Sequence, residues 1–455
     1  MDSTIPGKNN RREILGWINY DWANSVFSTT VVGVLIGDYV TTLAQKAVGE
    51  NGAIISLGGY DLVTAKSIFA YTVGSSVFLQ IFFLPILGAI ADYTHLKKTF
   101  MAFFCFLGAF ACCLLFFVQG NLYLMGCAFF LVANLSFGAS IVFYNSFLSD
   151  ITTEDQRDKV SSWGFAAGYV SGFLVLLANL YFLKNCESWG ISVEMAVRLC
   201  LLASGIWWGG FSLITFALVK QRQPERAVPV GKNYVSAGLA ELKETIIELF
   251  TLKHTLRFLI AYLLYNDGIQ TVITASSIFL SQELFVARGL ETDRSVLIVA
   301  FLIAQFVAFF GAMTFERIAH FTNAKTAILI SLAIWSCIVI YAYGFLNTVG
   351  QAYVMSGMIG FVLGGSQALS RSLFSKMIPK GRESSFFGIY EISERGTSWI
   401  GPIVFGLVAQ LTDSYRPAIL ALIVFFIIGS LILLFTDTKQ AIIEAGNIAE
   451  DPIVA

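Results

Sequence analysis

Charged residues are scarce in this sequence. Asp, Glu, Lys and Arg make up 13% of the 455 residues, whereas hydrophobic types make up 56%. A soluble domain carries roughly 25% charged residues, so the composition excludes an ordinary soluble fold. The formal net charge of −1 gives no indication of a nucleic-acid partner.

Histidine is nearly absent, and the sequence lacks the common catalytic motifs. The three histidines, His95, His254 and His320, are too scattered for a metal site. No Walker phosphate loop and no G-x-S-x-G is present, so an ATP-driven pump and a serine hydrolase have no support. Only Cys186 of the seven cysteines falls outside the apolar runs, so no structural disulfide is expected. We therefore expect neither an enzyme nor a cofactor.

Long apolar runs are abundant instead. A membrane-spanning helix needs ~20 apolar residues, and twelve runs qualify, with approximate limits 14–42, 65–91, 99–119, 121–148, 161–183, 194–219, 255–282, 294–314, 324–346, 348–374, 386–411 and 416–435. The first run is too long for a cleaved signal peptide. The sequence thus predicts an all-α membrane protein with twelve transmembrane helices, in contact with membrane lipid.

Basic residues mark alternate connections between these runs. They precede helix 1 and follow helices 2, 4, 6, 8 and 10, whereas residues 119–122 and 347–350 contain no Lys or Arg. Loops rich in Lys and Arg face the cytoplasm. Both termini and the long 6–7 connection are therefore expected to be cytoplasmic.

The 6–7 connection divides the chain into two halves of six helices, 1–219 and 255–455, joined by a linker over 220–254. The linker holds "AELKETIIELF", an amphipathic stretch whose apolar face includes Ile246, Ile247 and Phe250. Two interpretations stay open: a short helix on the cytoplasmic rim, or a site for a lipid or partner.

Three short sequences recur in the two halves, in the same order. "YDWANS" at 20–25 matches "NDGIQT" at 266–271, "GAIADYTHLKK" at 88–98 matches "ERIAHFTNAKT" at 316–326, and the helix ends "NSFLSD" and "RSLFSK" correspond. These matches indicate an internal duplication. Parallel repeats of six helices are typical of the major facilitator fold.

The loop "GAIADYTHLKK" resembles the gating motif of that superfamily's loop 2–3. Its members here are Gly88, Asp92, Lys97 and Lys98. The glycine allows close helix approach, and the aspartate can face the positive N-terminal end of helix 11. An ordinary capped turn is the alternative. His320 replaces the aspartate in the second half, so the gating role is not extended to that copy.

The chain resembles one branch of the superfamily, the autophagy-related vacuolar amino-acid effluxers of fungi and their bacterial relatives. The resemblance runs nearly end to end and rests on "YDWANS", "YNDG", "GGSQALSRSLFSKMIP", "FFGIYEISERGTSWIGP" and "AIIEAGN". It implies a secondary transporter and export of amino acids. Arg371, in the third of these sequences, is assigned to the gate. The chain lacks the large insertions of a vacuolar member, so the bacterial inner membrane is the expected location.

Two polar stripes interrupt the apolar runs of helices 1 and 7. An isolated carboxylate in hydrocarbon costs several kcal/mol, so such stripes face a bundle interior or a water-filled cavity. Helices 1 and 7 line the central cavity of this fold, so we expect the stripes to bind substrate there. Their members are Asp21, Asn24, Ser28, Asn266, Asp267, Gln270 and Thr274.

Helix 11 is the third charged element. Glu391 and Arg395 are spaced i, i+4 and can pair within the helix, which leaves Glu394 as the first candidate for coupling to protons. All three are assigned to coupling. The alternative is that these charges neutralise one another as structural contacts between the halves.

These features predict a monomeric secondary transporter that moves a small polar or zwitterionic, amino-acid-like solute by alternating access, with a proton as coupling ion. A transporter-fold receptor that binds the solute without translocating it is the alternative. The sequence leaves substrate and direction open.

Overall fold

The computed structural model describes residues 8–49, 52–57, 60–93, 96–221, 234–290, 294–396 and 400–447. It is almost entirely helical, with one small antiparallel hairpin, β1 (Ala53–Leu57) and β2 (Tyr60–Thr64), in the loop after the first span. The sequence analysis did not predict the hairpin, because its strands are short and do not belong to an extended stretch of alternating apolar and polar residues.

Helices before residue 220 form one group, which we call the N-terminal group. It contains α1 (Arg11–Val26), the π-helix η1 (Phe27–Leu35), α2 (Ile36–Val48), α3 (Ile68–Asp92), α4 (Lys97–Leu114), α5 (Tyr123–Ile151), α6 (Glu154–Asn185) and α7 (Val193–Leu218). α1, η1 and α2 are continuous, so the first span is longer than the apolar run that predicts it.

Helices after residue 252 form the C-terminal group. It contains α9 (Lys253–Leu284), α10 (Arg294–Phe321), α11 (Ala324–Gly344), α12 (Val349–Lys376), α13 (Glu383–Glu391), the π-helix η5 (Ile392–Gly396), α14 (Ile400–Thr412), α15 (Tyr415–Ala421), α16 (Ile423–Leu434) and α17 (Thr438–Glu444). Between the groups lies α8 (Tyr234–Thr251). Short 3-10 turns, η2 (Leu115–Phe117), η3 (Cys186–Trp189) and η4 (Val286–Arg288), end three spans.

Eleven helices of the described residues are long and apolar enough to cross a membrane. The remaining predicted span, helix 11, is divided into α13, η5 and the shorter apolar helix α14. π-helical turns inside α-helices are frequent at functional sites. η5 covers residues 392–396 of the charged sequence "EISERG".

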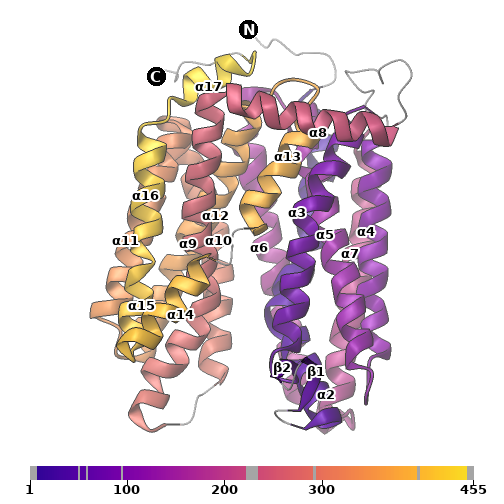
Figure 1. Ribbon diagram of the computed structural model, residues 1–455, viewed down its shortest axis with the longest axis vertical. Helices are drawn as coiled ribbons and strands as arrows, with labels where there is room; N and C mark the ends of the chain where they lie inside the picture. The colour runs from indigo at the N-terminus through magenta and orange to yellow at the C-terminus, as the bar shows by residue number, and fades with distance from the viewer. Residues whose placement is uncertain are drawn as a thin grey trace.

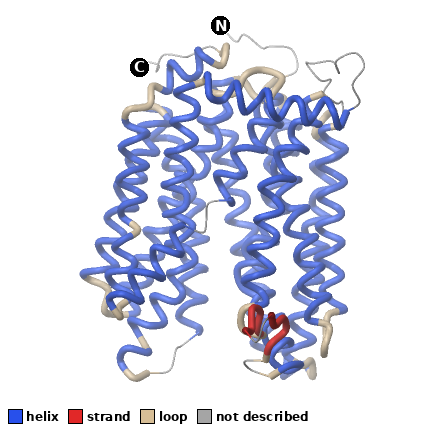
Figure 2. The backbone as a smooth tube through the Cα atoms, in the orientation of Figure 1, coloured by secondary structure: helices blue, strands red, loops and turns tan. Residues whose placement is uncertain are grey.

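The two groups stand side by side with their helices roughly parallel (Figures 1 and 2). Both described chain ends and α8 lie at one end of the bundle, which we call the terminal end. Across the groups, α6 packs on α10 and α12, and α3 packs on α13. In Figure 2 the groups run close together at the terminal end and diverge toward the other.

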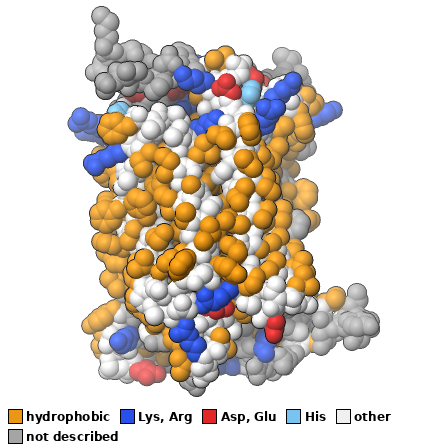
Figure 3. All heavy atoms as spheres, turned by 90° about the vertical axis from the view of Figure 1, so that its left-hand side faces the viewer, with side chains coloured by type: hydrophobic (Ala, Val, Ile, Leu, Met, Phe, Trp, Pro, Cys, Tyr) orange, Lys and Arg blue, Asp and Glu red, His pale blue; other side chains and the backbone are white. Residues whose placement is uncertain are grey.

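The outer surface suits a bilayer. Figure 3 shows hydrophobic side chains over the middle of one face, with Lys and Arg near its two ends. Large apolar side chains such as Phe78, Phe110 and Leu431 are exposed, whereas a soluble protein would bury most of them. An apolar belt between two charged rims is the pattern of a membrane-spanning bundle.

Candidate functional site

Arg371 of α12 contacts α1, α5 and α6 of the N-terminal group. Its guanidinium stands over the rings of Trp17, Tyr144 and Phe165, with the guanidinium carbon 4.8, 5.4 and 4.2 Å from their centroids. It also donates to the hydroxyl and the carbonyl of Ser161, both at 2.9 Å. Only 3% of the residue is exposed. Aromatic faces and fixed acceptors are the surroundings that hold a desolvated guanidinium.

Asp21 of α1 is the anionic partner of Arg371. Its Oδ2 lies 3.3 Å from Nη1 of Arg371 and accepts a hydrogen bond of 2.7 Å from the hydroxyl of Tyr144. Trp17 stacks on Tyr144 with ring centroids 4.3 Å apart. The pair joins the N-terminal group to the C-terminal group and satisfies the carboxylate that the sequence leaves without an evident partner.

A second polar contact joins the groups beside this pair. Asn145 of α5 donates to Oε1 of Glu391 at 3.0 Å, and its Oδ1 lies 3.4 Å from Nη1 of Arg371. Glu391, at the end of α13, is completely buried. The side chain of Arg395 lies outside the described part of the structure, so the predicted pair between Glu391 and Arg395 stays a prediction.

The polar stripe of α9 contacts both η5 and α14 of helix 11. Asn266 donates to the carbonyl of Glu394, at 3.0 Å, in η5. Asp267 accepts a hydrogen bond of 2.8 Å from the amide of Gly401, at the start of α14. A carboxylate at a helix N-terminus is stabilised by the unpaired amides and the helix dipole. Asp267 therefore holds the start of α14 from a neighbouring helix.

Gly401 makes this capping possible. A Cβ there would lie 2.0 Å from the hydroxyl oxygen of Thr271, so only glycine allows α14 to approach α9 this closely. Asn266 and Asp267 are both buried, and in each the Oδ1 atom has no hydrogen-bond partner among the described residues. Unsatisfied buried acceptors are uncommon, and these are available to a ligand or to water.

The other predicted binding residues differ in exposure. Ser28 and Thr274 are exposed, Gln270 is half-buried and Asn24 is buried. Ser28 and Thr274 donate to carbonyls of their own helices, those of Ser25 and Gln270. Each stripe therefore runs from a buried aspartate toward accessible hydroxyl groups.

The predicted gating residues lie where α3 meets α13. Asp92 accepts hydrogen bonds from the amides of Ser384 and Ser385, at 2.9 and 2.8 Å, and from the hydroxyl of Ser385 at 2.5 Å. A Cβ on Gly88 would lie 2.2 Å from the carbonyl oxygen of Ser384. This is the geometry expected from the sequence: a carboxylate on the N-terminal end of helix 11 and a glycine at the closest approach.

The two lysines of this motif differ. Lys97 forms an ion pair of 3.0 Å with Asp150 at the end of α5, and its ammonium lies 5.5 Å from the ring centroid of Phe147. Both partners belong to the N-terminal group. Lys98 is only half-buried.

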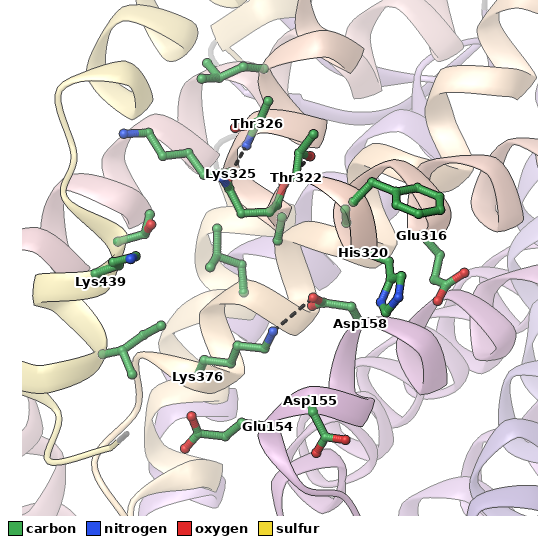
Figure 4. A pocket seen from close by; sticks show the side chains of 18 of the residues that line it. Glu154, Asp155, Asp158, Glu316, His320, Thr322, Lys325, Thr326, Lys376 and Lys439 are labelled. Carbon is green, nitrogen blue, oxygen red and sulfur yellow. Dashed lines mark hydrogen bonds and ion pairs between the residues drawn. The ribbon is translucent and has the colours of Figure 1, made fainter. Parts of the chain in front are cut away.

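The terminal end also carries a large mixed-charge cavity. It has a volume of about 1170 Å³ and is lined by the start of α6 and by helices of the C-terminal group. Figure 4 shows Asp158 of α6 pointing toward Lys376 of α12, an ion pair of 2.9 Å. Asp158 also accepts a hydrogen bond from Ser372. These contacts, like that of Asp92, join the two groups at the terminal end.

Within the described residues, no group of three or more His, Cys, Asp or Glu side chains could hold a metal ion. The sequence-based reasoning missed Tyr144, Asn145 and Ser161, and it did not match Asp21 with Arg371. One signal was present: a basic residue within an apolar run needs an anionic partner, and Arg371 and Asp21 are the matching charges.

Comparisons with known proteins decide the family. A family model described as "Vacuole effluxer Atg22 like" matches residues 9–446. The chain belongs to this family. Among its relatives is the uncharacterized MFS-type transporter YxiO of Bacillus subtilis, 30% identical over 93% of this chain and 95% of that protein. Autophagy-related protein 22 of Coccidioides immitis is 26% identical over 98% of this chain and 90% of its own.

Solved structures support the fold of this Atg22-like chain. The human organic anion transporter MFSD10 aligns with a TM-score of 0.64 at 12% identity, covering 93% of this chain and 99% of that one. The major facilitator transporter FucP in its outward conformation aligns with a TM-score of 0.63 at 12% identity, over 94% and 98%. The predicted major facilitator fold is confirmed. The relatives and structural neighbours are transporters, which confirms that the chain is not an enzyme.

Proposed function

We propose that this Atg22-like transporter moves a small zwitterionic, amino-acid-like solute by alternating access. The observation that carries the proposal is the buried pair of Asp21 and Arg371 between the two groups. A buried ion pair contributes little net stability, because desolvation offsets the attraction. A pair that must form and break between two states is a reason to keep charges at this position.

The closure of the bundle at its terminal end supports an outward-facing arrangement. Polar contacts between the groups gather at the terminal end, through Asp92 and Asp158, while Ser28 and Thr274 of the polar stripes are exposed. We propose that the terminal end is cytoplasmic, as the distribution of Lys and Arg predicts. The protein is proposed to be a monomer in a bacterial inner membrane. Its chain is proposed to consist of an N-terminal half (1–219), a linker (220–254) and a C-terminal half (255–455).

The solute site that we propose is formed by the two stripes. The ammonium group would lie near Asp267, whose Oδ1 has no hydrogen-bond partner among the described residues, and Asn266 and Gln270 would supply further acceptors. The other residues of the two stripes would border the solute. They are Asp21, Asn24, Ser28 and Thr274. Arg371, if released from Asp21, or Arg395 would receive the carboxylate.

Coupling to protons is proposed for helix 11. Glu391, at the end of α13, is buried and Glu394, in η5, is half-buried, where a change of charge can alter how α13 and α14 are held together. The proposed gating residues lie on the loop and helices that meet at the closed end. They are Gly88, Asp92, Lys97, Lys98 and Arg371.

The test is counterflow of labelled amino acids in vesicles that contain the purified protein. Asp267→Asn is expected to abolish ligand-dependent thermal stabilisation while the protein still folds, and Glu394→Gln to retain exchange but lose its response to a pH gradient. Normal binding and transport by Asp267→Asn would make that aspartate a structural cap only. A receptor would bind the solute without exchanging label across the bilayer, which separates the alternative function.

A further inference from the structure

The linker helix α8 contacts both groups through one buried carboxylate. Glu241 is completely buried; it accepts a hydrogen bond of 2.5 Å from the hydroxyl of Tyr93 and lies 3.1 Å from Nε of Arg382. Tyr93 directly follows Asp92 at the end of α3, and Arg382 directly precedes α13. Figure 1 shows α8 crossing α3 and α13 near their terminal ends.

Arg382 is held by three carboxylates of α8. Besides Glu241 it pairs with Glu244 at 3.6 Å and with Glu248. The three positions follow i, i+3 and i+7, so they form a row along one side of the helix, which we call the carboxylate row. The Arg382 side chain is 13% exposed. Such a multiple pair is stronger than an isolated surface ion pair.

The opposite side of α8 is apolar and unburied. Ile246, Ile247 and Phe250 are 43, 55 and 66% exposed, and Lys243, also exposed, shares their side at 3.6 residues per turn. We call these three apolar side chains the apolar face. Thr245 and Leu249, on the side toward the bundle, are buried.

A lipid surface is the partner that this face fits. The helix lies across the ends of membrane-spanning helices (Figure 1), at the depth where a bilayer changes from hydrocarbon to headgroups. Helices with exposed large apolar residues on one side and a basic residue beside them lie in this interface. Lys243 can extend to lipid phosphates while Phe250 enters the acyl region.

We propose that α8 is a membrane-docked strap. Its apolar face lies in the leaflet at the terminal end, and its carboxylate row holds Arg382 while Glu241 also holds Tyr93. The bilayer and the linker together then keep α3 and α13 in contact. Opening of the terminal end separates Tyr93 from Arg382, so Glu241 must give up one of its two partners. This role rests on the proposed transport function in one respect: the strap controls the opening of the terminal end.

The depth of α8 is measurable with nitroxide labels on the full chain in nanodiscs of three parts phosphatidylcholine to one part phosphatidylglycerol. Labels are placed on Ile247→Cys, on Lys380→Cys as the aqueous reference, and on Ile427→Cys of α16 as the lipid reference, with the signal of the labelled parent chain subtracted. At Ile247, collisions with oxygen are expected to exceed those with a nickel chelate, as at Ile427. A label at Ile247 that behaves like that at Lys380 overturns the proposal.

The strap is measurable through the amides of Ser384 and Ser385, which Asp92 protects when the end is closed. In hydrogen exchange of the reconstituted chain, Arg382→Gln and the combined Ile246→Ser, Ile247→Ser and Phe250→Ser variant are each expected to speed exchange at these amides by about tenfold. Lys380→Gln, in the same loop, is the matched control and is expected to stay within about twofold.

The two variants make the result decisive. The combined variant leaves the carboxylate row and Arg382 intact, so faster exchange in it reports the lipid contact and not a broken ion pair. Unchanged exchange in both variants overturns the strap. Neither measurement involves transport, so a failure of the proposed function would leave these expectations unaltered, and their failure would leave the proposed function in place.

Discussion

Two aspartates in equivalent positions of the repeat have different partners, and this difference begins at single residues. Asp21 pairs with Arg371, whereas Asp267 accepts a hydrogen bond from the amide of Gly401. The matching helix ends "RSLFSK" and "NSFLSD" have Arg371 and Asn145 as their first residues. One aspartate thus meets a cation across the groups, and the other is balanced by the start of a helix within its own group. The sequence repeat is symmetric, but its electrostatics are not.

The first prediction concerns the buried pair of Asp21 and Arg371. Asp21→Asn leaves the guanidinium without its counter-ion, and removing one partner of a buried pair destabilises by about 3–5 kcal/mol. A double variant with Arg371→Gln is expected to recover part of this loss, because no unpaired charge is then left. Thermal denaturation of the purified variants measures both effects. If the loss in the double variant equals the sum of the losses in Asp21→Asn and Arg371→Gln alone, the two residues do not interact in the native state.

At the scale of elements, helix 11 differs most from a regular span. α13 packs on α3 of the other group, while α14 is capped by α9 of its own group. The π-helix η5 lies between them and includes Glu394. We expect the terminal-end part of the helix to change its contacts while the outer part stays attached, because α13 packs on the other group and α14 is held within its own. The proposed coupling residues lie on helix 11, and the proposed gating residue Asp92 contacts its first turn.

The second prediction concerns the contact between Asp92 and α13. Asp92→Ala removes a carboxylate that accepts two backbone hydrogen bonds, and bonds to charged groups contribute about 1.5–3 kcal/mol each. We expect slower exchange transport with ligand affinity kept within a few-fold, because the contact holds the closed end and not the solute. Counterflow rates and ligand-dependent thermal shifts measure the two quantities separately. Lost affinity with unchanged exchange would place Asp92 in the binding site.

The third prediction concerns Glu383, the first residue of α13, at the terminal end and outside the apolar span. Burial raises the pKa of this carboxyl to about 7, and the negative charges of Asp150 and Asp92 add to the effect, against the opposing charge of Lys97. The closed arrangement therefore binds a proton more tightly than an unfolded or opened one. The contribution of Glu383 to its stability is greatest at low pH and falls as the pH rises from about 4.5 to about 7.

The measurement is hydrogen exchange at the Ser384 and Ser385 amides between pH 5.5 and 8, corrected for the intrinsic pH dependence of exchange. Protection is expected to decrease toward pH 8 in the parent chain and to lose this pH dependence in Glu383→Gln. Lys380→Gln, nearby in the same loop, serves as the control. The same pH dependence in the parent and in Glu383→Gln would exclude Glu383 as its source.

At the scale of the whole molecule, two groups of helices are joined by polar contacts at one end and diverge toward the other (Figure 2). The contacts at the terminal end involve ion pairs and helix ends, through Asp92, Asp158 and Arg371. Toward the other end an aromatic pair, Phe173 with Phe306, joins α6 and α10 at 5.5 Å between centroids. Hydrogen bonds and ion pairs at the terminal end require a fixed geometry, whereas the aromatic pair toward the other end does not. This combination suits groups that rock about their interface.

The fourth prediction concerns the orientation of the molecule. Gln440, exposed in α17 close to the C-terminus, is expected to face the cytoplasm. In intact bacterial cells, a cysteine at Gln440 should not react with an impermeant maleimide from outside, and it should react in inside-out vesicles. The parent chain gives the background from its native cysteines. Labelling of intact cells above that background would reverse the proposed topology.

The class of the protein, most of its spans and the repeat follow from the sequence alone. Those properties depend on local composition: a run of apolar residues is inserted as a helix wherever it occurs, and a charge in hydrocarbon is costly whatever surrounds it. For the same reason the sequence could single out Asp21 and Asp267 as charges in need of explanation, whereas Arg371 was assigned only to the gate.

The pairing of the buried charges depends on the tertiary structure. Asp21 and Arg371 are 350 positions apart in the chain, and hydropathy carries no information on such pairs. The position of α14 and the proposed strap α8 depend on the same kind of distant contact, since Asp267 contacts α14 across 134 positions and Tyr93 contacts Glu241 across 148. Packing of preformed helices selects these partners, because each buried polar group must find its hydrogen bonds among whichever neighbours the fold brings near.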